Sequence, residues 1–192
     1  MNKELILRNV RFSYLHIDQP KAAKQGDKPR YSANFILEPG HPQIDEVRKI
    51  IREIEAAEFG GREITGKDTC FRNGNTMVDE DNEVRDGYVD AFYISAARAE
   101  KRKAPRVVNL NKRDVRPGDS DFPQSGDYGN VIVNFYSLNG KNDKGGDKSH
   151  GKKVCCEIGT IQFATKGEPL GGGGGFGNLD SLPGESDDND DL

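Results

Sequence analysis

The chain of 192 residues contains no tryptophan, only two methionines and three cysteines, and no apolar run of eighteen residues. Without such a run, no segment is expected to cross a membrane as a helix. The N-terminus, Met1–Leu5, also lacks the apolar stretch of a signal peptide. We therefore expect a cytoplasmic protein with no membrane partner. Cys155 and Cys156 are adjacent, Cys70 stands alone and there is no CxxC pair, so the cysteines are expected to be reduced and structural.

Recognisable catalytic and cofactor motifs are missing as well. The histidines His16, His41 and His150 are isolated, with no HExxH or Cys/His ligand spacing. No serine lies in a GxSxG elbow, and no GK[ST] follows the glycine run that starts at Gly171. We therefore expect a protein that is not an enzyme, with no catalytic residues, no metal site and no cofactor.

One acidic stretch keeps an enzymatic alternative open. Asp79, Glu80 and Asp81 are consecutive carboxylates that could hold a divalent cation for phosphodiester cleavage. They have no regular ligand spacing and no strand context, so a solvated turn is the favoured interpretation. The alternative is a metal-dependent nuclease.

Charge is distributed unevenly along the chain. The last 26 residues, Gly167–Leu192, hold a run of five glycines, seven acids and no lysine or arginine. This composition offers too little apolar surface to offset the entropy of ordering. We therefore predict one folded domain over residues 1–166 and a disordered acidic tail over 167–192. The first 166 residues carry 28 bases against 25 acids, a net charge of +3, which suggests nucleic acid as a partner or simply a tail that aids solubility.

The pattern of apolar residues predicts strands and one helix. Short β-branched or aromatic runs predict strands over residues 5–14, 31–37, 89–95, 128–136 and 153–165, with a further short strand at 107–108. Ile44, Val47, Ile51 and Ile54 recur at helical spacing before Gly60-Gly61, which predicts an amphipathic helix. Loops are expected over 18–30, 66–87 and 111–126, with a hairpin tip at 140–151. Five or six strands and one helix, without βαβ alternation, predict a mainly β fold built as a small closed antiparallel barrel.

The strongest candidate for a binding surface lies over residues 94–116. This stretch holds eight bases and two acids, a local net charge of +6. Aromatic residues lie directly before it and on other strands. Single-stranded bases stack on such rings while Lys and Arg follow the phosphates, with no need for a particular sequence. The candidate DNA-binding residues are Tyr14, Tyr31, Phe92, Tyr93, Arg98, Lys101, Arg102, Lys103, Arg106, Lys112, Arg113 and Tyr136.

Each of these residues also has an ordinary structural interpretation. A charge run of this kind is often a solvated hairpin, and aromatic residues on strands are often core residues. Strand alternation separates them only in part: Phe35 is expected to point inward, while Tyr136 shares a face with Asn130 and Asn134 and is expected to be exposed.

Several short segments, in a fixed order, resemble a known family. They are Asn9–Tyr14, Pro20–Ala22, Pro29–Phe35, Arg116–Asp119, Tyr128–Val131, Ile161–Phe163 and Gly167–Gly173. Together they are similar to phage-encoded single-stranded DNA-binding proteins of the OB-fold type, which carry an acidic C-terminal tail. The resemblance extends over almost the whole chain.

The resemblance implies an oligonucleotide-binding barrel that coats single-stranded DNA in phage replication, recombination and repair, in the host cytoplasm. Proteins of this family are often dimers, so the resemblance implies a homodimer. Duplex DNA or RNA is expected to bind more weakly than single-stranded DNA. The resemblance also implies a tail that competes with DNA and recruits replication or recombination proteins through Asp187, Asp188, Asp190, Asp191 and Leu192. Related tails commonly end in an aromatic residue, whereas this one ends in Leu192, which weakens the expectation of a terminal aromatic contact. A protein-interaction module that never meets DNA remains a second alternative.

Overall fold

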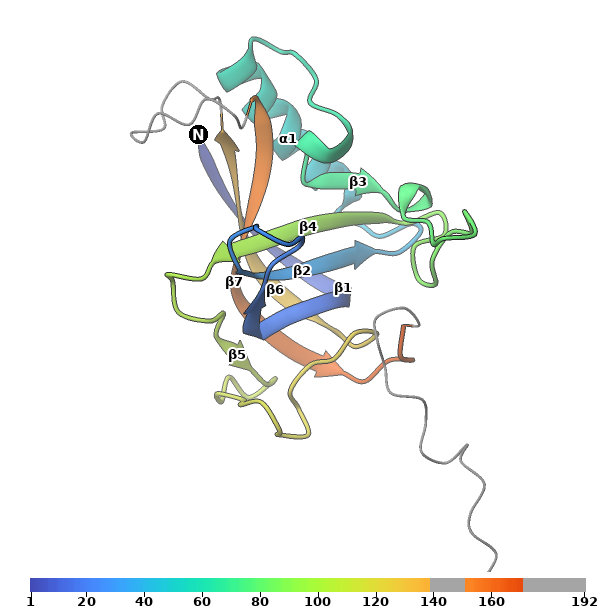
Figure 1. Ribbon diagram of the computed structural model, residues 1–192, viewed down its shortest axis with the longest axis vertical. Coiled ribbons are helices and arrows are strands. Elements are labelled where there is room, and N and C mark those ends of the chain that lie inside the picture. The colour runs from blue at the N-terminus through green and yellow to red at the C-terminus, as the bar shows by residue number, and fades with distance from the viewer. Residues whose placement is uncertain (139–150, 171–192) are drawn as a thin grey trace, which may run out of the picture.

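The computed structural model describes residues 1–138 and 151–170 (Figure 1). Its strands are β1 (Asn2–Lys21), β2 (Arg30–Leu37), β3 (Phe71–Asn73), β4 (Phe92–Ala99), β5 (Val107–Val108), β6 (Tyr128–Leu138) and β7 (Lys153–Thr165). The α-helix is α1 (Ile44–Phe59), and two 3-10 turns, η1 (Gly66–Asp68) and η2 (Gly74–Thr76), flank β3. The segments predicted as a hairpin tip and as an acidic tail lie mostly outside the described residues.

A closed barrel forms the centre of the molecule. The strands follow the order β3-β4-β2-β1-β6-β7-β5, and β4 also pairs with β7. This additional pairing joins β1, β2, β4, β7 and β6 into a five-stranded barrel. The closing contact, Ala97 opposite Glu157, is parallel, whereas the other four pairings of the barrel are antiparallel. The predicted mainly β barrel with one helix is therefore confirmed, with one parallel contact that strand patterns alone did not indicate.

β1 pairs with a different strand in each of its halves, which explains how the barrel closes. Its first half pairs with β6 and its second half with β2. Register shifts separate Leu7 from Val10 and Ser13 from His16, and positive φ angles lie inside them, 51° at Asn9 and 49° at Tyr14. Such bulges bend a strand and increase its twist. The predicted strand over residues 5–14 was too short, because β1 continues past these bulges to Lys21.

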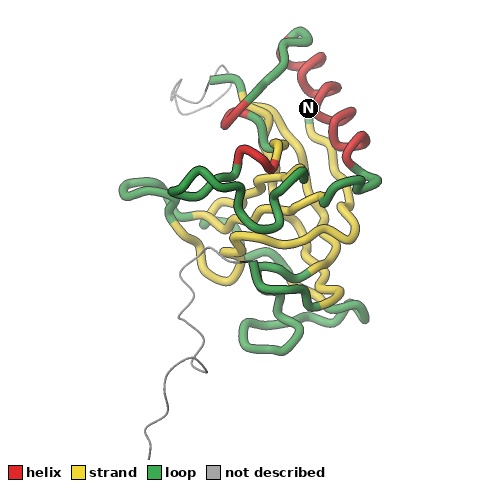
Figure 2. Tube along the Cα trace, turned by 90° about the vertical axis from the view of Figure 1, so that its right-hand side faces the viewer, coloured by secondary structure: helices red, strands yellow, loops and turns green. Residues whose placement is uncertain are grey.

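The helix covers one end of the barrel (Figure 2). Val47, Ile51, Ile54 and Phe59 are buried in the main core, as the helical spacing of the apolar residues predicted. The helix ends at Gly60, whose φ of 66° is the left-handed conformation that a glycine cap supplies without strain. The predicted helix is confirmed. No helix in the described part of the chain is long and apolar enough to cross a membrane.

Two predictions near β4 were wrong in detail. The third strand begins at Phe92 rather than at residue 89, and Val89 is 56% exposed in the turn before it. The stretch predicted as loop over 66–87 contains β3, which pairs with β4 from Phe71 to Asn73. Three residues are too few to produce a recognisable alternation of polar and apolar side chains.

The first four residues of the predicted tail contact the barrel. Arg11 Nη2 donates a hydrogen bond to the Glu168 carbonyl at 2.8 Å, and Gly167 N–H donates to Asp127 Oδ1 at 3.2 Å. Leu170 packs against a small apolar cluster on the outside of the sheet. The approach is close, since a Cβ on Gly126 would lie 2.1 Å from the Glu168 carbonyl oxygen. The chain is therefore held to the barrel as far as Leu170.

Candidate nucleic-acid interface

The outer face of β2 and β4 has two different halves. Residues directly opposite each other in a sheet share a face, so Asn34 with Ser95, Ile36 with Tyr93, and Ser32 with Ala97 all point outward. Asn34, Ile36 and Tyr93 are buried, at 8%, 0% and 4% exposure, although they lie outside the barrel. We call this the covered half.

Residues 74–91, which connect β3 to β4, form the cover. Tyr88 is 1% exposed, and Asn34 Nδ2 donates a hydrogen bond of 2.9 Å to its hydroxyl. Its ring meets the edge of the Tyr93 ring at 5.2 Å between centroids. Burial raises the pKa of Tyr88 to about 12, against the lowering effect of hydrogen bonds with Ser13 and Asn34. This half of the face is therefore sealed.

The other half of the face is open. It has a floor of small side chains, Ser32, Ala97 and Ala99, of which Ala99 is exposed and the other two are partly exposed. Arg30 lies opposite Ala99 at its edge. Small residues make a shallow floor on which a flat ligand meets no protruding side chain. We call this open half, with its edges, the β4 face.

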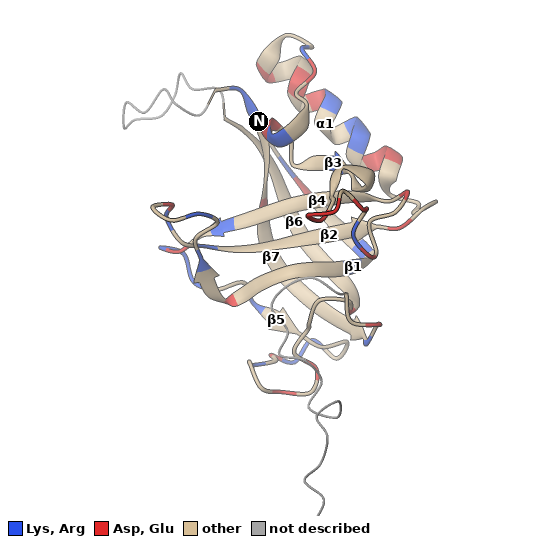
Figure 3. Cartoon of the chain, turned by 45° about the vertical axis from the view of Figure 1, so that its right-hand side comes forward, with Lys and Arg blue, Asp and Glu red and all other residues tan. Residues whose placement is uncertain are grey.

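Cations gather where β4 ends (Figure 3). The β1–β2 hairpin brings Lys21 opposite Arg30, and Arg30 lies opposite Ala99, the last residue of β4. The loop that follows β4 carries most of the predicted basic run. Two segments that are about 70 residues apart in sequence therefore meet at one end of the β4 face. The hairpin also contains Lys24 and Lys28, both exposed.

The structure divides the predicted cations by what they contact. Arg98 donates to the Lys103 carbonyl at 2.8 Å and to the Ile158 carbonyl at 3.0 Å, so it fixes the loop to β7. Arg102 pairs with Glu157, and Arg106 pairs with Asp114 at 2.5 Å. Lys101 and Lys103 are exposed, and no ion pair to either is found within the described residues. These two lysines are free to meet phosphates.

Lys112 and Arg113 lie apart from the others. They occupy the turn after β5, which pairs with β7 at Ile161 and Gln162. Four residues of β7, about 13 Å of strand, separate Ile161 from Glu157 beside the β4 face. The predicted basic run is therefore two surfaces in space.

The predicted aromatic residues are dispersed. Tyr93 is buried under Tyr88, and Tyr14 packs against the same apolar cluster. Tyr31 lies opposite Arg98 on the barrel-facing side of β2, at the mouth of the barrel. Phe92 stacks on Phe71 in a groove beside α1. Among the predicted rings, Tyr136 is the one that the register places on the outer surface next to the β4 face.

Tyr136 is partly buried, and burial together with the neighbouring Cys155 and Glu157 raises its pKa. It is paired with Cys155, two residues from Glu157, which faces Ala97. Burial raises the pKa of the Cys155 thiol. This pKa is lowered in turn by the charge of Lys153, by a hydrogen bond with Tyr136 and by the charges of Arg30 and Arg72. The charges of Arg30 and Arg72 therefore act on Cys155, the residue paired with Tyr136. Neither arginine was among the predicted residues. Arg30 was assigned to a loop, and Arg72 lies on the unrecognised strand β3.

The acidic stretch forms a local turn. Asp79 Oδ1 accepts the backbone N–H groups of Asp81 at 2.9 Å and Glu83 at 3.0 Å, and Val78 pairs with Val84 across the turn. Within the described residues, no three His, Cys, Asp or Glu side chains are placed to hold a metal ion. The carboxylate of Asp79 is used to hold the turn together.

The fold and this surface define a class of protein. A closed five-stranded barrel that presents the outer face of its second and third strands beside a basic hairpin is an oligonucleotide-binding barrel. The model of a family described as the single-stranded DNA-binding protein of Enterobacter phage Enc34 matches residues 3–192. The chain belongs to this family of phage single-stranded DNA-binding proteins, as the sequence resemblance implied.

Solved structures agree on the fold. The single-stranded DNA-binding protein from bacteriophage Enc34, in complex with single-stranded DNA, superimposes with a TM-score of 0.65 at 20% identity and covers 88% of this chain and 89% of its own. A further structure of the single-stranded DNA-binding protein from bacteriophage Enc34 gives 0.63 at 19% identity, covering 90% of this chain and 87% of its own. Gp2.5 of bacteriophage T7, a single-stranded DNA-binding protein, gives 0.53 at 16% identity, covering 100% and 99%. No curated protein sequence matches the chain.

Proposed function

We propose that this chain binds single-stranded DNA without sequence preference and coats it during phage replication, and that it has no catalytic activity. The observation that carries the proposal is the arrangement around the β4 face. A floor of small residues lies between the exposed lysines of the β4–β5 loop and Tyr136, with Arg30 and Arg72 nearby. Phosphates would follow the cations while bases lie on the floor and against the Tyr136 ring.

The family supports further roles that we include in the proposal. Residues 171–192 are proposed to remain an acidic arm that competes with DNA and recruits replication or recombination proteins, with Asp187, Asp188, Asp190, Asp191 and Leu192 at its end. Recombination and repair are proposed as further uses of the same coat. A homodimer, weaker binding of duplex DNA and RNA, and action in the host cytoplasm complete the proposal.

A salt titration with charge variants tests the proposal. Fluorescein-labelled oligo-dT is titrated at several salt concentrations, and log Kd against log salt is expected to change by about 0.7 for each phosphate contacted. Lys101→Glu/Lys103→Glu should weaken binding at low salt and reduce this slope by about 1.4. Lys112→Glu/Arg113→Glu makes the same charge change on the separate turn and should have less than half the effect. A salt-independent affinity would contradict the proposal.

The same labelled DNA separates binding from cleavage. Incubation with Mg²⁺ or Mn²⁺ should leave its length unchanged, whereas shortening that Asp79→Ala abolishes would establish the nuclease alternative. A gel shift with single-stranded DNA, duplex DNA and RNA of equal length should rank single-stranded DNA first. Absence of any shift in dilute buffer would favour the protein-interaction alternative.

A further inference from the structure

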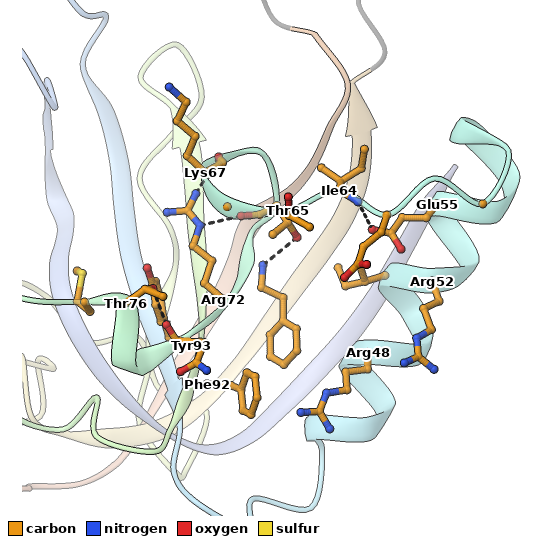
Figure 4. Close-up of a pocket in the computed structure, with 18 residues that line it drawn as sticks. Arg48, Arg52, Glu55, Ile64, Thr65, Lys67, Arg72, Thr76, Phe92 and Tyr93 are labelled. Carbon is orange, nitrogen blue, oxygen red and sulfur yellow. Dashed lines mark hydrogen bonds between the residues drawn. The ribbon is translucent and has the colours of Figure 1, made fainter. Parts of the chain in front are cut away.

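A groove beside the β4 face lies between α1 and the edge strand β3 (Figure 4). Its volume is about 1010 Å³. Arg48 and Arg52 of α1 line one wall, Phe71 and Arg72 of β3 line the other, and Lys67 lies at the rim. The predicted basic stretch over residues 94–116 and the β4 face both lie outside this groove, although the predicted binding residues Phe92 and Tyr93 line it.

Aromatic and guanidinium groups are stacked in the groove. The Phe71 and Phe92 rings are 5.1 Å apart between centroids and inclined by 21°, and Arg48 Cζ lies 4.6 Å from the Phe92 centroid. Both rings are partly exposed. Arg48 also pairs with the exposed Asp45 at 3.0 Å, a surface contact that a phosphate can replace at little cost. The groove therefore presents a stack of flat groups to water, which is the surface that unpaired bases bind.

The charge of the groove suits a polyanion. Four bases and two acids line it, and one of the acids, the buried Glu55, accepts the Ile64 N–H at 2.7 Å. Arg52 and Lys67 are exposed. The cations thus face outward while Glu55 is turned to a backbone amide inside the fold, leaving Glu63 as the acid at the rim.

Arg72 joins the groove to the β4 face. Its guanidinium is held by the carbonyls of Thr69 at 2.8 Å and Lys67 at 3.0 Å. It lies opposite Tyr93 on the outward side of β3, and its charge reaches Cys155 beside Tyr136. Arg72 therefore lies on the outward side of the edge strand β3, where it can contact a strand of DNA that leaves the groove toward the β4 face.

We propose that this groove is a second subsite for the same single strand of DNA, where bases stack against Phe71 and Phe92 and phosphates meet Arg52, Lys67 and Arg72. This inference rests on the proposed function of the β4 face. The eight residues of β4 span about 23 Å, and this is a lower limit for the path between the two sites, because Phe92 faces the side of the sheet opposite to the β4 face. At about 3.4 Å per stacked nucleotide, a strand needs at least about seven nucleotides to connect them. Short oligonucleotides engage one site and longer ones engage both.

The length dependence of binding tests the inference. For the full chain, affinity for dT18, after correction for the roughly 13 overlapping six-nucleotide positions that it offers, should exceed that for dT6 by at least about tenfold, because one additional stacked base alone is worth that much. Arg52→Glu/Lys67→Glu should bind dT6 as the unmodified chain does, with the gain for dT18 reduced to about threefold or less. Lys49→Glu/Arg62→Glu changes the same charge at exposed positions outside the groove and should keep the gain.

The measured gains distinguish loss of the second subsite from failure of the proposed function. An unreduced gain in Arg52→Glu/Lys67→Glu overturns the second subsite while the β4 face stands. Failure of the unmodified chain to bind either length overturns the proposed function itself. Phe92→Leu, checked for folding by its unfolding midpoint, should lose the gain as well, and retention of the full gain in that variant would overturn the stacking contact.

Discussion

The two halves of the outer face of β2 and β4 are built from the same two strands but are used in opposite ways. In the covered half, Asn34, Ile36 and Tyr93 are buried beneath Tyr88 and the rest of residues 74–91. In the open half, the equivalent positions are Ser32, Ala97 and Ala99, with cations at the edge. Large side chains need a cover, and small ones leave room for a ligand.

This difference limits the part of the outer face of the barrel on which the proposed site can lie. The covered half has its polar groups paired within the protein, because Tyr88 and Asn34 hydrogen-bond to each other. A strand of DNA therefore has no unpaired polar partner there and no accessible ring. The open half offers the ring of Tyr136 and exposed cations. Among these cations, Lys101 and Lys103 form no ion pair within the described residues. The proposed site is therefore confined to the open half of the face.

The largest expected effect comes from removing the ring that seals the covered half. Tyr88→Ala should lower the free energy of unfolding by about 3–5 kcal/mol, as is usual when a buried aromatic side chain is truncated. Urea unfolding measures the change. Val89→Ala, at the exposed neighbouring position, should stay within about 0.5 kcal/mol of the unmodified chain. Equal effects at both positions would show that residues 74–91 do not seal the face.

The next effect concerns the open half. Tyr136→Ala should weaken binding of oligo-dT by about 1–3 kcal/mol, the usual worth of one stacked base. Tyr136→Phe keeps the ring and should bind nearly as well, although it loses the hydrogen bond with Cys155. Fluorescence anisotropy at one fixed salt concentration compares the three proteins. An Ala variant that binds normally would remove Tyr136 from the site.

The contrast between the halves also marks how far the sequence could predict the site. Alternation in residues 31–37 correctly predicted that Phe35 points inward, where it is buried in the core. It could not show that Asn34 and Ile36 are buried too, because Tyr88, which covers them, is more than fifty positions away. A local charge count found Lys101 and Lys103. Arg30 and Arg72 escaped it, because they approach Tyr136 only through the pairing of β2, β3, β4 and β7.

The fold was predictable where the pattern was long and local. The helix and the strand over Lys153–Thr165 follow from their own residues. The length of β1 was not predictable from its residues, because bulges at Asn9 and Tyr14 interrupt its alternation. The parallel contact that closes the barrel involves residues 60 positions apart, Ala97 and Glu157, and no local pattern records it.

A third effect concerns residues 167–170, which end beside the covered half. Leu170 packs against the cluster that contains Tyr88, so a chain ending at Lys166 should unfold about 1–2 kcal/mol more easily than one ending at Leu170. The reason is the loss of this partly buried side chain and of the bond from Arg11 to the Glu168 carbonyl. Thermal unfolding compares the two truncated proteins. Identical midpoints would mean that residues 167–170 contribute nothing to the barrel.

This pair of truncations also sharpens any test of the acidic segment. Both proteins lack residues 171–192, so an effect of the acids on DNA affinity should be the same in each. Ending the chain at Leu170 is therefore the cleaner way to remove the acids, because it leaves the contacts of Gly167 and Glu168 intact.

The smallest effect tests whether the Tyr88 hydroxyl stays uncharged and shielded from solvent in the covered half. Tyr88→Phe keeps the ring but leaves Asn34 Nδ2 without its hydroxyl partner, which should cost about 1 kcal/mol at pH 7. The pKa of Tyr88 is raised to about 12 in the fold, whereas an ordinary tyrosine has a pKa of about 10. Between these values the unfolded chain has lost a proton that the folded chain retains, so stability falls as pH rises.

The Tyr88→Phe variant has no phenol at this position. Its free energy of unfolding therefore does not fall through ionisation of that group as pH rises. The advantage of the unmodified chain at pH 7 should therefore shrink above about pH 10 and vanish at about pH 11. Urea unfolding of both proteins from pH 7 to pH 11 follows the change, and the other buried phenols and thiols are common to the two. A constant difference across this range would mean that Tyr88 ionises as freely in the fold as in water, and that the cover over this half of the face is open to solvent.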